Sequence, residues 1–273
     1  MIGHTSSDPI PSRPDALALT STSRAADAGF LALADMSSIA AELRLDYRIV
    51  GGHMVTLLTA AHGVAGQVPM RETLDADFAA LPTVIADPRL LRALAERGYQ
   101  RVDAANRFVR DRRDDLGPLN LVVDILAPSY QSTLVPNQRH GDLVVDEVHG
   151  LVLALNRPAT LLHLDVRLTS ADELSLRVAL PDVASALCVK ALAYRGRFAG
   201  KDAIDLWRLL NAAYVAGLRV ESWPTSVTGR DAAQILHRFF GAPGATGLKQ
   251  VSARSADRTR MQALVGRIVA RPE

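Results

Sequence analysis

The sequence predicts an α+β fold, in which a small mixed sheet with helices is followed by a helical C-terminal part. Between about residue 47 and residue 180, short apolar runs are separated by turn residues, which is typical of strands. After Pro181, apolar residues recur at helical spacing almost to the end of the chain. Of the 273 residues, 48% are apolar, so the chain can bury the core of one large domain or of two closely packed ones.

The chain begins with a Ser/Thr/Pro-rich stretch, and we expect residues 1–34 to form a partly disordered leader. A helix then runs up to Leu43. Residues 47–50 predict a short strand, which ends at Gly51-Gly52, and residues 53–61 predict a helix. This region therefore has the order strand, glycine turn and helix N-terminus.

Strict alternation of apolar and polar residues over 73–79 predicts the next strand and places Asp75 and Asp77 on the same face. Asp87 caps a helix that has a proline at its first position and that ends at Gly98. Further strands are expected at residues 99–103, 107–110 and 119–126, the last of them strongly apolar and ended by Pro128.

Short apolar runs recur between residues 143 and 180, and we expect them to be antiparallel additions to the sheet. They cover residues 143–148, 151–155, 161–168 and 174–180. The helices of the C-terminal part are expected at residues 182–195, 201–216, 230–240 and 256–270.

Composition excludes several classes of protein. No apolar run reaches the roughly 18–20 residues of a membrane helix, and the N-terminus lacks a signal-peptide pattern, so we expect a cytoplasmic protein without a membrane. The single cysteine, Cys188, excludes an internal disulfide and a cysteine-rich zinc site. Charge is uneven: residues 181–273 hold 14 Lys and Arg against 7 Asp and Glu, whereas residues 1–180 hold 17 against 22. This excess fits a part that faces a polyanion, or else a solvated helical surface.

Three aspartates are the candidate metal ligands. Asp75 and Asp77 are two residues apart on a strand, so their Cα atoms lie about 6.5–7 Å apart on one face and both side chains can reach one ion. Asp124 follows a strongly apolar run, where an unpaired charge would be costly. Oxygen ligands of this kind suit Mg²⁺ or Mn²⁺, and three carboxylates can hold two such ions. An Asp-x-Asp alone would be more typical of a turn or a solvated strand face.

The glycine pair Gly51-Gly52 is the candidate phosphate-binding turn. Without side chains, its backbone amides can approach a triphosphate, and the helix N-terminus that follows favours negative charge. His53 comes next, and its imidazole either donates a hydrogen bond to phosphate or has no ligand.

With these motifs in this order, the chain resembles the polymerase-beta superfamily of nucleotidyltransferases, in which a Gly-Gly or Gly-Ser turn precedes an Asp-x-Asp strand. Residues 71–77, Arg-Glu-Thr-Leu-Asp-Ala-Asp, are similar to those of the AbiEii and MenA-type (MenT-like) toxins of type IV or related toxin–antitoxin systems. That branch also carries a helical lysine and a Lys-Asp-x-x-Asp helix, which Lys190 and residues 201–205 resemble. The spacing from Gly52 to Asp75 suits the toxin branch, although many members have Ser or Thr at the position of His53.

The resemblance implies a nucleotidyltransferase catalytic domain at residues 35–180 and a helical C-terminal domain at residues 181–273. It implies catalytic roles for Asp75, Asp77, Asp124, Lys190 and Asp205, with the three aspartates as metal ligands. It implies a nucleotide-binding set of Gly51, Gly52, His53, Arg71, Thr73, Lys190 and Arg195.

The reaction implied by the resemblance is transfer of a nucleoside monophosphate from a nucleoside triphosphate to an acceptor hydroxyl. In the toxin branch the acceptor is the 3′ end of tRNA, the transfer blocks translation, and a cognate antitoxin restrains the enzyme. Two alternatives remain open: transfer to a protein or a small antibiotic, and a non-catalytic domain that binds nucleotide or RNA.

Overall fold

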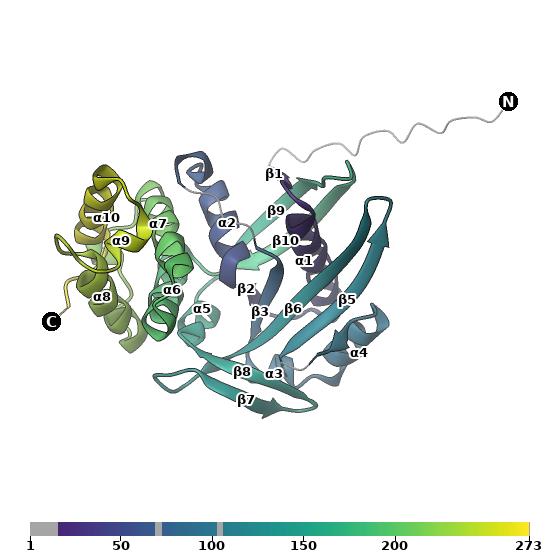
Figure 1. Cartoon of the computed structure of the whole chain (residues 1–273). Coiled ribbons are helices and arrows are strands. Elements are labelled where there is room, and N and C mark those ends of the chain that lie inside the picture. Colours follow the sequence, from purple (N-terminus) through teal and green to yellow (C-terminus); the bar gives the residue numbers. More distant parts are fainter. Residues whose placement is uncertain (1–15, 69–72, 103–105, 273) are drawn as a thin grey trace.

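The computed structural model describes residues 16–68, 73–102 and 106–272. The fold is α+β, as predicted, with mixed sheets and helices followed by a helical C-terminal part. Figure 1 shows the strands on one side of the molecule and helices α6 to α10 gathered on the other. Among the described residues, no helix combines the length and apolar character that crossing a membrane would need.

The larger sheet carries the predicted aspartates. Its strands follow the order β2-β3-β6-β5-β4, and β8 extends it by pairing with β6 and with β7. Within the described residues, the seven strands of this sheet are β2 (Tyr47–Ile49), β3 (Asp75–Ala80), β4 (Gln100–Arg101), β5 (Arg107–Asp114), β6 (Gly117–Ser129), β7 (Val135–His140) and β8 (Leu143–His149). Strand β6 is the centre of this arrangement, because β3, β5 and β8 all pair with it.

The smaller sheet has the order β1-β9-β10, with β1 (Leu17–Thr20) parallel to β9 (Thr160–Arg167) and β10 (Glu173–Leu180) antiparallel to it. Helix α1 (Arg24–Leu43) contacts β3, β6 and β10, and so packs against both sheets. The described part of the expected leader at residues 1–34 contains β1 and the first half of α1. The expected boundary after residue 34 falls inside α1.

Three expectations about the strands are wrong. Residues 151–155 belong to helix α5 (Leu151–Asn156), because Gly150, with φ +96°, turns the chain away from β8. Strand β8 pairs with β6 in parallel rather than antiparallel. Strand β6 does not end before Pro128 but continues to Ser129, beyond the residues where β3 and β5 pair with it.

The other predicted helices are present, and the short helices α3 and α9 were not predicted. Helix α2 (Gly51–Ala61) follows β2, and α4 (Pro88–Glu96) begins after Asp87, which caps it by accepting from the Arg89 N–H. After the short α3 (Pro82–Ile85) and the sheets come α6 (Val183–Arg197), α7 (Gly200–Val215), α8 (Val227–Phe240), α9 (Leu248–Val251) and α10 (Ser255–Ile268). Single 3₁₀ turns lie at Ala65–Gln67 and Val220–Ser222.

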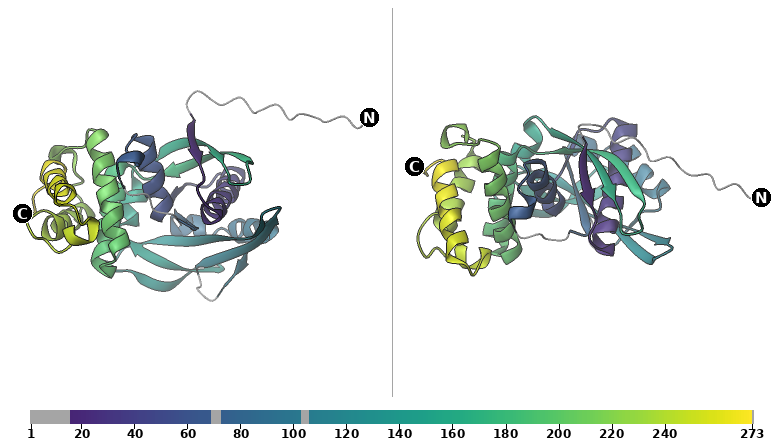
Figure 2. Two further views of the ribbon diagram at one scale, coloured as in Figure 1. Left: turned by 45° about the horizontal axis from the view of Figure 1, so that its top comes forward. Right: turned by 90° about the horizontal axis from the view of Figure 1, so that it is seen from above.

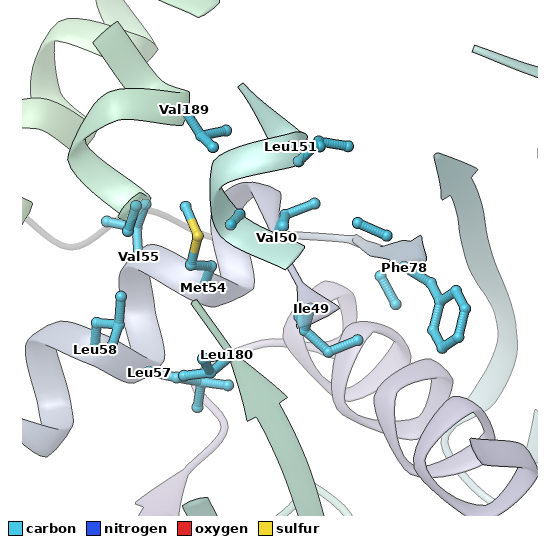
Figure 3. Packing of buried hydrophobic residues seen from close by; sticks show 14 of the residues in the cluster. Ile49, Val50, Met54, Val55, Leu57, Leu58, Phe78, Leu151, Leu180 and Val189 are labelled. Carbon is cyan, nitrogen blue, oxygen red and sulfur yellow. The ribbon is translucent and has the colours of Figure 1, made fainter. Parts of the chain in front are cut away.

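One apolar core joins the sheets to the C-terminal helices. Figure 3 shows Val189 of α6 above Val55 and Met54 of α2, with Leu151 of α5 beside them. Cys188 is buried in α6, as expected of a residue that fills the core.

Arg208 of α7 is also buried, and its Nη2 donates to the hydroxyls of Thr56 and Thr59 on α2 at 3.3 Å each. The C-terminal helices therefore pack directly on the helix that follows the glycine turn, and Figure 2 shows these elements beside each other in two further views.

Candidate active site

A cavity of about 730 Å³ lies between the larger sheet and helices α6 and α7. Its volume is in the range typical of small-molecule sites. Residues of β3, β5 and β6 line one wall, which we call the acid wall: Asp75, Asp77, Asp124 and Arg107. Residues of α6 and α7 line a second wall, which we call the lysine wall: Lys190, Arg195, Arg197, Lys201 and Asp202.

Strand pairing brings the three aspartates of the acid wall together. Strands β3 and β6 run parallel, and Asp77 lies directly opposite Asp124, while Asp75 shares a face with Asp77. One carboxylate oxygen from each of the three lies within 4.8 Å of the other two. The sheet therefore places three oxygen donors around one point, although they come from segments almost fifty residues apart.

The glycine turn is packed against this cluster. Gly51 has φ +66°, and a Cβ built on it would lie 1.7 Å from Oδ2 of Asp77. The preceding Val50 N–H donates to the Asp77 carbonyl at 2.9 Å. A glycine is needed here for two reasons, the left-handed backbone and the close approach of the carboxylate. The turn and the acid wall are thus one unit.

Electrostatics of the acid wall favour a bound cation. Burial, together with the neighbouring charges of Asp75 and Asp124, raises the pKa of Asp77 to about 7. Lys190 lies near enough to oppose this rise. A cluster of oxygen donors that resists ionisation by itself fits a hard divalent cation such as Mg²⁺ or Mn²⁺, which offsets the repulsion when it binds.

Arg107 of β5 also belongs to the acid wall. Its Nε and Nη2 donate to the two carboxylate oxygens of Asp124 at 2.9 and 2.7 Å, and Nη2 also donates to Asp75 at 3.3 Å. The antiparallel register places Arg107 directly opposite Asp124. The same carboxylates hold the already very high pKa of this guanidinium even higher, chiefly through the hydrogen bond to Asp124.

The lysine wall contains a buried ion-pair network. Lys190 Nζ donates to Asp205 Oδ2 at 2.8 Å and lies 3.9 Å from Asp202 Oδ1. Arg197 donates from Nε and Nη2 to both oxygens of Asp202, at 3.1 and 2.8 Å. Both aspartates are fully buried, whereas Arg197 is largely exposed. The break between α6 and α7, where Phe198 adopts a left-handed conformation, brings these side chains together.

The structure brings most of the predicted site residues to the cavity. Gly51, Gly52 and Arg195 line it, and Arg195 also donates to the Ser132 carbonyl at 3.4 Å. Asp205 lies behind Lys190 and is not itself part of the lining. Arg71 lies outside the described residues.

Two predicted nucleotide-binding residues are placed elsewhere. His53 is buried against α1, where its ring centroid lies 5.6 Å from that of Phe30 and its imidazole fills the space beside Gly29. Thr73 is buried against Gly52. Neither residue lines the cavity. They follow the glycine turn and precede Asp75 in the sequence, but their side chains point into the packing behind these motifs.

Sequence reasoning missed Arg107, although a signal for it exists. The hairpin that joins β5 and β6 turns between Asp114 and Gly117, which pair with each other. Seven residues before Asp114 on β5 is Arg107, and seven residues after Gly117 on β6 is Asp124, so these two residues lie opposite each other. The third wall of the cavity was missed as well; it contains Ser132, Thr133, Leu134, Asp146 and His149.

Comparisons with known proteins give little more than a distant likeness of fold. No protein-family model matches the sequence, and no curated protein matches it. The chain is similar in structure to an antigenic nucleotidyltransferase-like protein from Paracoccidioides brasiliensis, with 16% sequence identity and a TM-score of 0.49. The similarity covers 87% of this chain and 92% of that chain. Any assignment of activity therefore depends on the geometry of the cavity.

Proposed function

We propose that this protein is a metal-dependent nucleotidyltransferase, which transfers a nucleoside monophosphate from a nucleoside triphosphate to an acceptor hydroxyl. One observation carries the proposal: three converging carboxylates and a buried lysine line a single cavity. A magnesium triphosphate presents both cations and anions. Carboxylates can bind its metal ions, and a lysine can bind its phosphates.

In this proposal Asp75, Asp77 and Asp124 hold Mg²⁺ or Mn²⁺. Bound ions of this kind neutralise phosphate charge and polarise the attacking oxygen. The acceptor hydroxyl gives its proton to solvent water, its oxygen forms a bond to the α-phosphorus, the bond from that phosphorus to the bridging oxygen breaks, and pyrophosphate leaves with that electron pair. The fixed backbone of Gly51 and Gly52, at the N-terminus of α2, borders the cavity where the phosphates would lie.

Lys190 has the role of a fixed positive charge in this site. Its ammonium group is almost fully buried, and Asp205 holds it in position through a 2.8 Å hydrogen bond. A preorganised donor in a site that excludes water stabilises developing phosphate charge more strongly than a mobile surface lysine does. Asp205 therefore acts through Lys190, as a positioning residue.

For the acceptor we propose the 3′ end of tRNA, so that transfer blocks translation, and for the biological role a toxin that a cognate antitoxin restrains. The support is the resemblance of residues 71–77, Lys190 and residues 201–205 to the AbiEii and MenA-type toxins, together with the positive charge of residues 181–273. Arg195, Arg197 and Lys201 present part of this charge at the cavity.

The test is a labelling experiment with the whole chain. The protein is incubated with each α-labelled triphosphate and Mg²⁺, together with total tRNA, a total protein extract or an aminoglycoside. Label in the tRNA fraction supports the full proposal, whereas label in protein or antibiotic retains the transferase and replaces its acceptor. The matched controls are Asp75→Asn, which should be inactive, and Asp115→Asn, an exposed aspartate in the β5–β6 turn, which should be active. Absence of label in every fraction, with triphosphate still bound, would identify a non-catalytic domain.

A further inference from the structure

The acid wall contains a cation of its own. Arg107 donates to both oxygens of Asp124 and to one of Asp75, so its guanidinium lies among the oxygens that would hold a metal ion. Two parallel N–H···O bonds to one carboxylate are the strongest arrangement that an arginine forms. The side chain of Asp124 is only 10% exposed, which strengthens the pairing further.

The guanidinium neutralises only part of the negative charge. Three carboxylates face one cation, and among the described residues Asp77 receives no hydrogen bond from Arg107. The repulsion that remains still favours a divalent ion, but Arg107 opposes that ion in two ways. It repels the ion directly, and it stabilises the arrangement of carboxylates that exists before the ion binds.

We propose that Arg107 is a built-in counter-cation that keeps the affinity of the acid wall for a free divalent ion low, so that the ion binds together with a triphosphate. The inference rests on the proposed function, because it takes the acid wall to be the metal site. A triphosphate brings negative charge that offsets the guanidinium and offers it other oxygens to pair with. The side chain is 41% exposed and faces the cavity, so that exchange of partners is sterically open.

The size of the effect follows from Coulomb's law. A single and a double positive charge about 5 Å apart repel enough, even at the dielectric constant of water, to weaken binding on the order of tenfold. Loss of the Asp124 pairing acts in the same direction, since it destabilises the metal-free state. We therefore expect neutral substitutions of Arg107 to strengthen the binding of a divalent ion in the absence of nucleotide.

The experiment measures the binding of Mn²⁺ to the full chain in the absence of nucleotide. The electron paramagnetic resonance signal reports the concentration of the free ion. Arg107→Gln should bind Mn²⁺ about tenfold more tightly than the wild type. Arg107→Met, which keeps most of the aliphatic stem, should show the same gain, so either variant decides the question if the other does not fold. The matched control is Arg110→Gln, because Arg110 lies on the same strand and pairs with Asp35 at 2.9 Å, away from the acid wall; it should leave the affinity unchanged.

A thermal readout accompanies the titration. A ligand that binds only the folded state raises the melting temperature according to its concentration relative to its Kd, so Mn²⁺ should raise that of Arg107→Gln more than that of the wild type. Equal or weaker binding of Mn²⁺ by a folded Arg107→Gln variant would overturn the inference and leave the metal site standing. If no protein binds Mn²⁺ in a manner that depends on Asp75, the metal site itself is wrong, and the proposed function fails with it.

Discussion

The acid wall and the lysine wall both mix cations with carboxylates, but they balance their charges differently. On the acid wall, three carboxylates face the single guanidinium of Arg107. On the lysine wall, two buried carboxylates, Asp202 and Asp205, are matched by Lys190 and Arg197. The acid wall therefore has an excess of negative charge for a ligand to neutralise, whereas each of the two buried carboxylates beside the lysine wall already has a cationic partner.

This difference distinguishes residues that bind a ligand directly from residues that position a ligand-binding side chain. Removing the charge of Asp75 or Asp77 from the acid wall relieves repulsion, and should cost activity but not stability. Removing Lys190 from the lysine wall takes away the ammonium that pairs with the buried Asp205, and should cost both activity and stability. The four predictions that follow test this contrast, in order of decreasing effect.

The largest effect is expected for the metal ligands. Asp75→Asn or Asp77→Asn should abolish nucleotidyl transfer, because the cluster loses a charged oxygen donor. At pH 8, Asp77→Asn should also raise the melting temperature of the metal-free protein. The pKa of Asp77 is raised to about 7 from its ordinary value of 3.8, so its ionisation destabilises the fold progressively between those pH values and fully above them. Calorimetry in chelator checks the second part, and a lower melting temperature would contradict the contrast between the walls.

Lys190→Ala should reduce turnover by about 10²–10³, as for the loss of one preorganised electrostatic donor. Unlike the Asp75 and Asp77 variants, it should also lower the free energy of unfolding by roughly 3–5 kcal/mol, because it removes the buried ammonium that pairs with Asp205. Lys190→Arg should not restore full activity, since a planar fork does not replace a point charge. Single-turnover kinetics and urea unfolding measure the two effects. A Lys190→Ala protein as stable as the wild type would place this lysine outside the buried network.

The glycine turn allows a matched pair of substitutions. Gly51 and Gly63 have nearly the same positive φ, +66° and +67°, but only at Gly51 would a Cβ meet Asp77. Gly63→Ala should therefore cost only the left-handed strain, about 1 kcal/mol. Gly51→Ala should cost more stability and should also reduce transfer, by displacing the Asp77 carboxylate. Equal losses of stability in the two variants, measured by urea unfolding, would mean that the close approach has no energetic weight.

The smallest effect concerns the acceptor. If the positive residues of the C-terminal part contact an RNA backbone, the affinity for tRNA should fall with salt by about 0.7 to 0.9 log units per log unit of salt for each phosphate contacted. Neutralising Arg195 together with Arg197 should reduce this slope by about one for each lost contact, and neutralising Arg258 with Arg260 gives the comparison far from the cavity. Titration of tRNA into the Asp75→Asn protein at several salt concentrations measures this dependence of affinity on salt. Weak binding that does not depend on salt would exclude the RNA acceptor but not the transferase.

Much of the acid wall could be predicted because its elements have strong local patterns. Residues 73–79 alternate strictly, and the apolar run before Asp124 allows few structures other than a buried strand. The short elements were less predictable. Residues 151–155 are too few and too uniformly apolar to distinguish a helix from a strand, and β7 is polar and contains Pro136.

Arg107 and the placement of His53 could not be predicted for another reason. Their roles depend on strand register and on helix packing, which bring together residues distant in the sequence. The register of β5 against β6 is set by the turn at residues 114–117, so an error of one residue there would place Arg107 on the opposite face. His53 follows the glycine turn directly, but the packing of α2 on α1 directs its ring away from the cavity.

The hydrogen bonds from Arg208 to Thr56 and Thr59 have a consequence for how the protein unfolds. They join α7, which carries Asp205, to α2, which begins at the glycine turn. A cut between residues 180 and 181 would separate buried surfaces on both sides and remove Arg208, which is only 2% exposed, from the hydroxyls of Thr56 and Thr59. The C-terminal helices are therefore not a module that could be exchanged or expressed alone. Denaturation should proceed as one cooperative transition, in which both walls of the cavity are lost together.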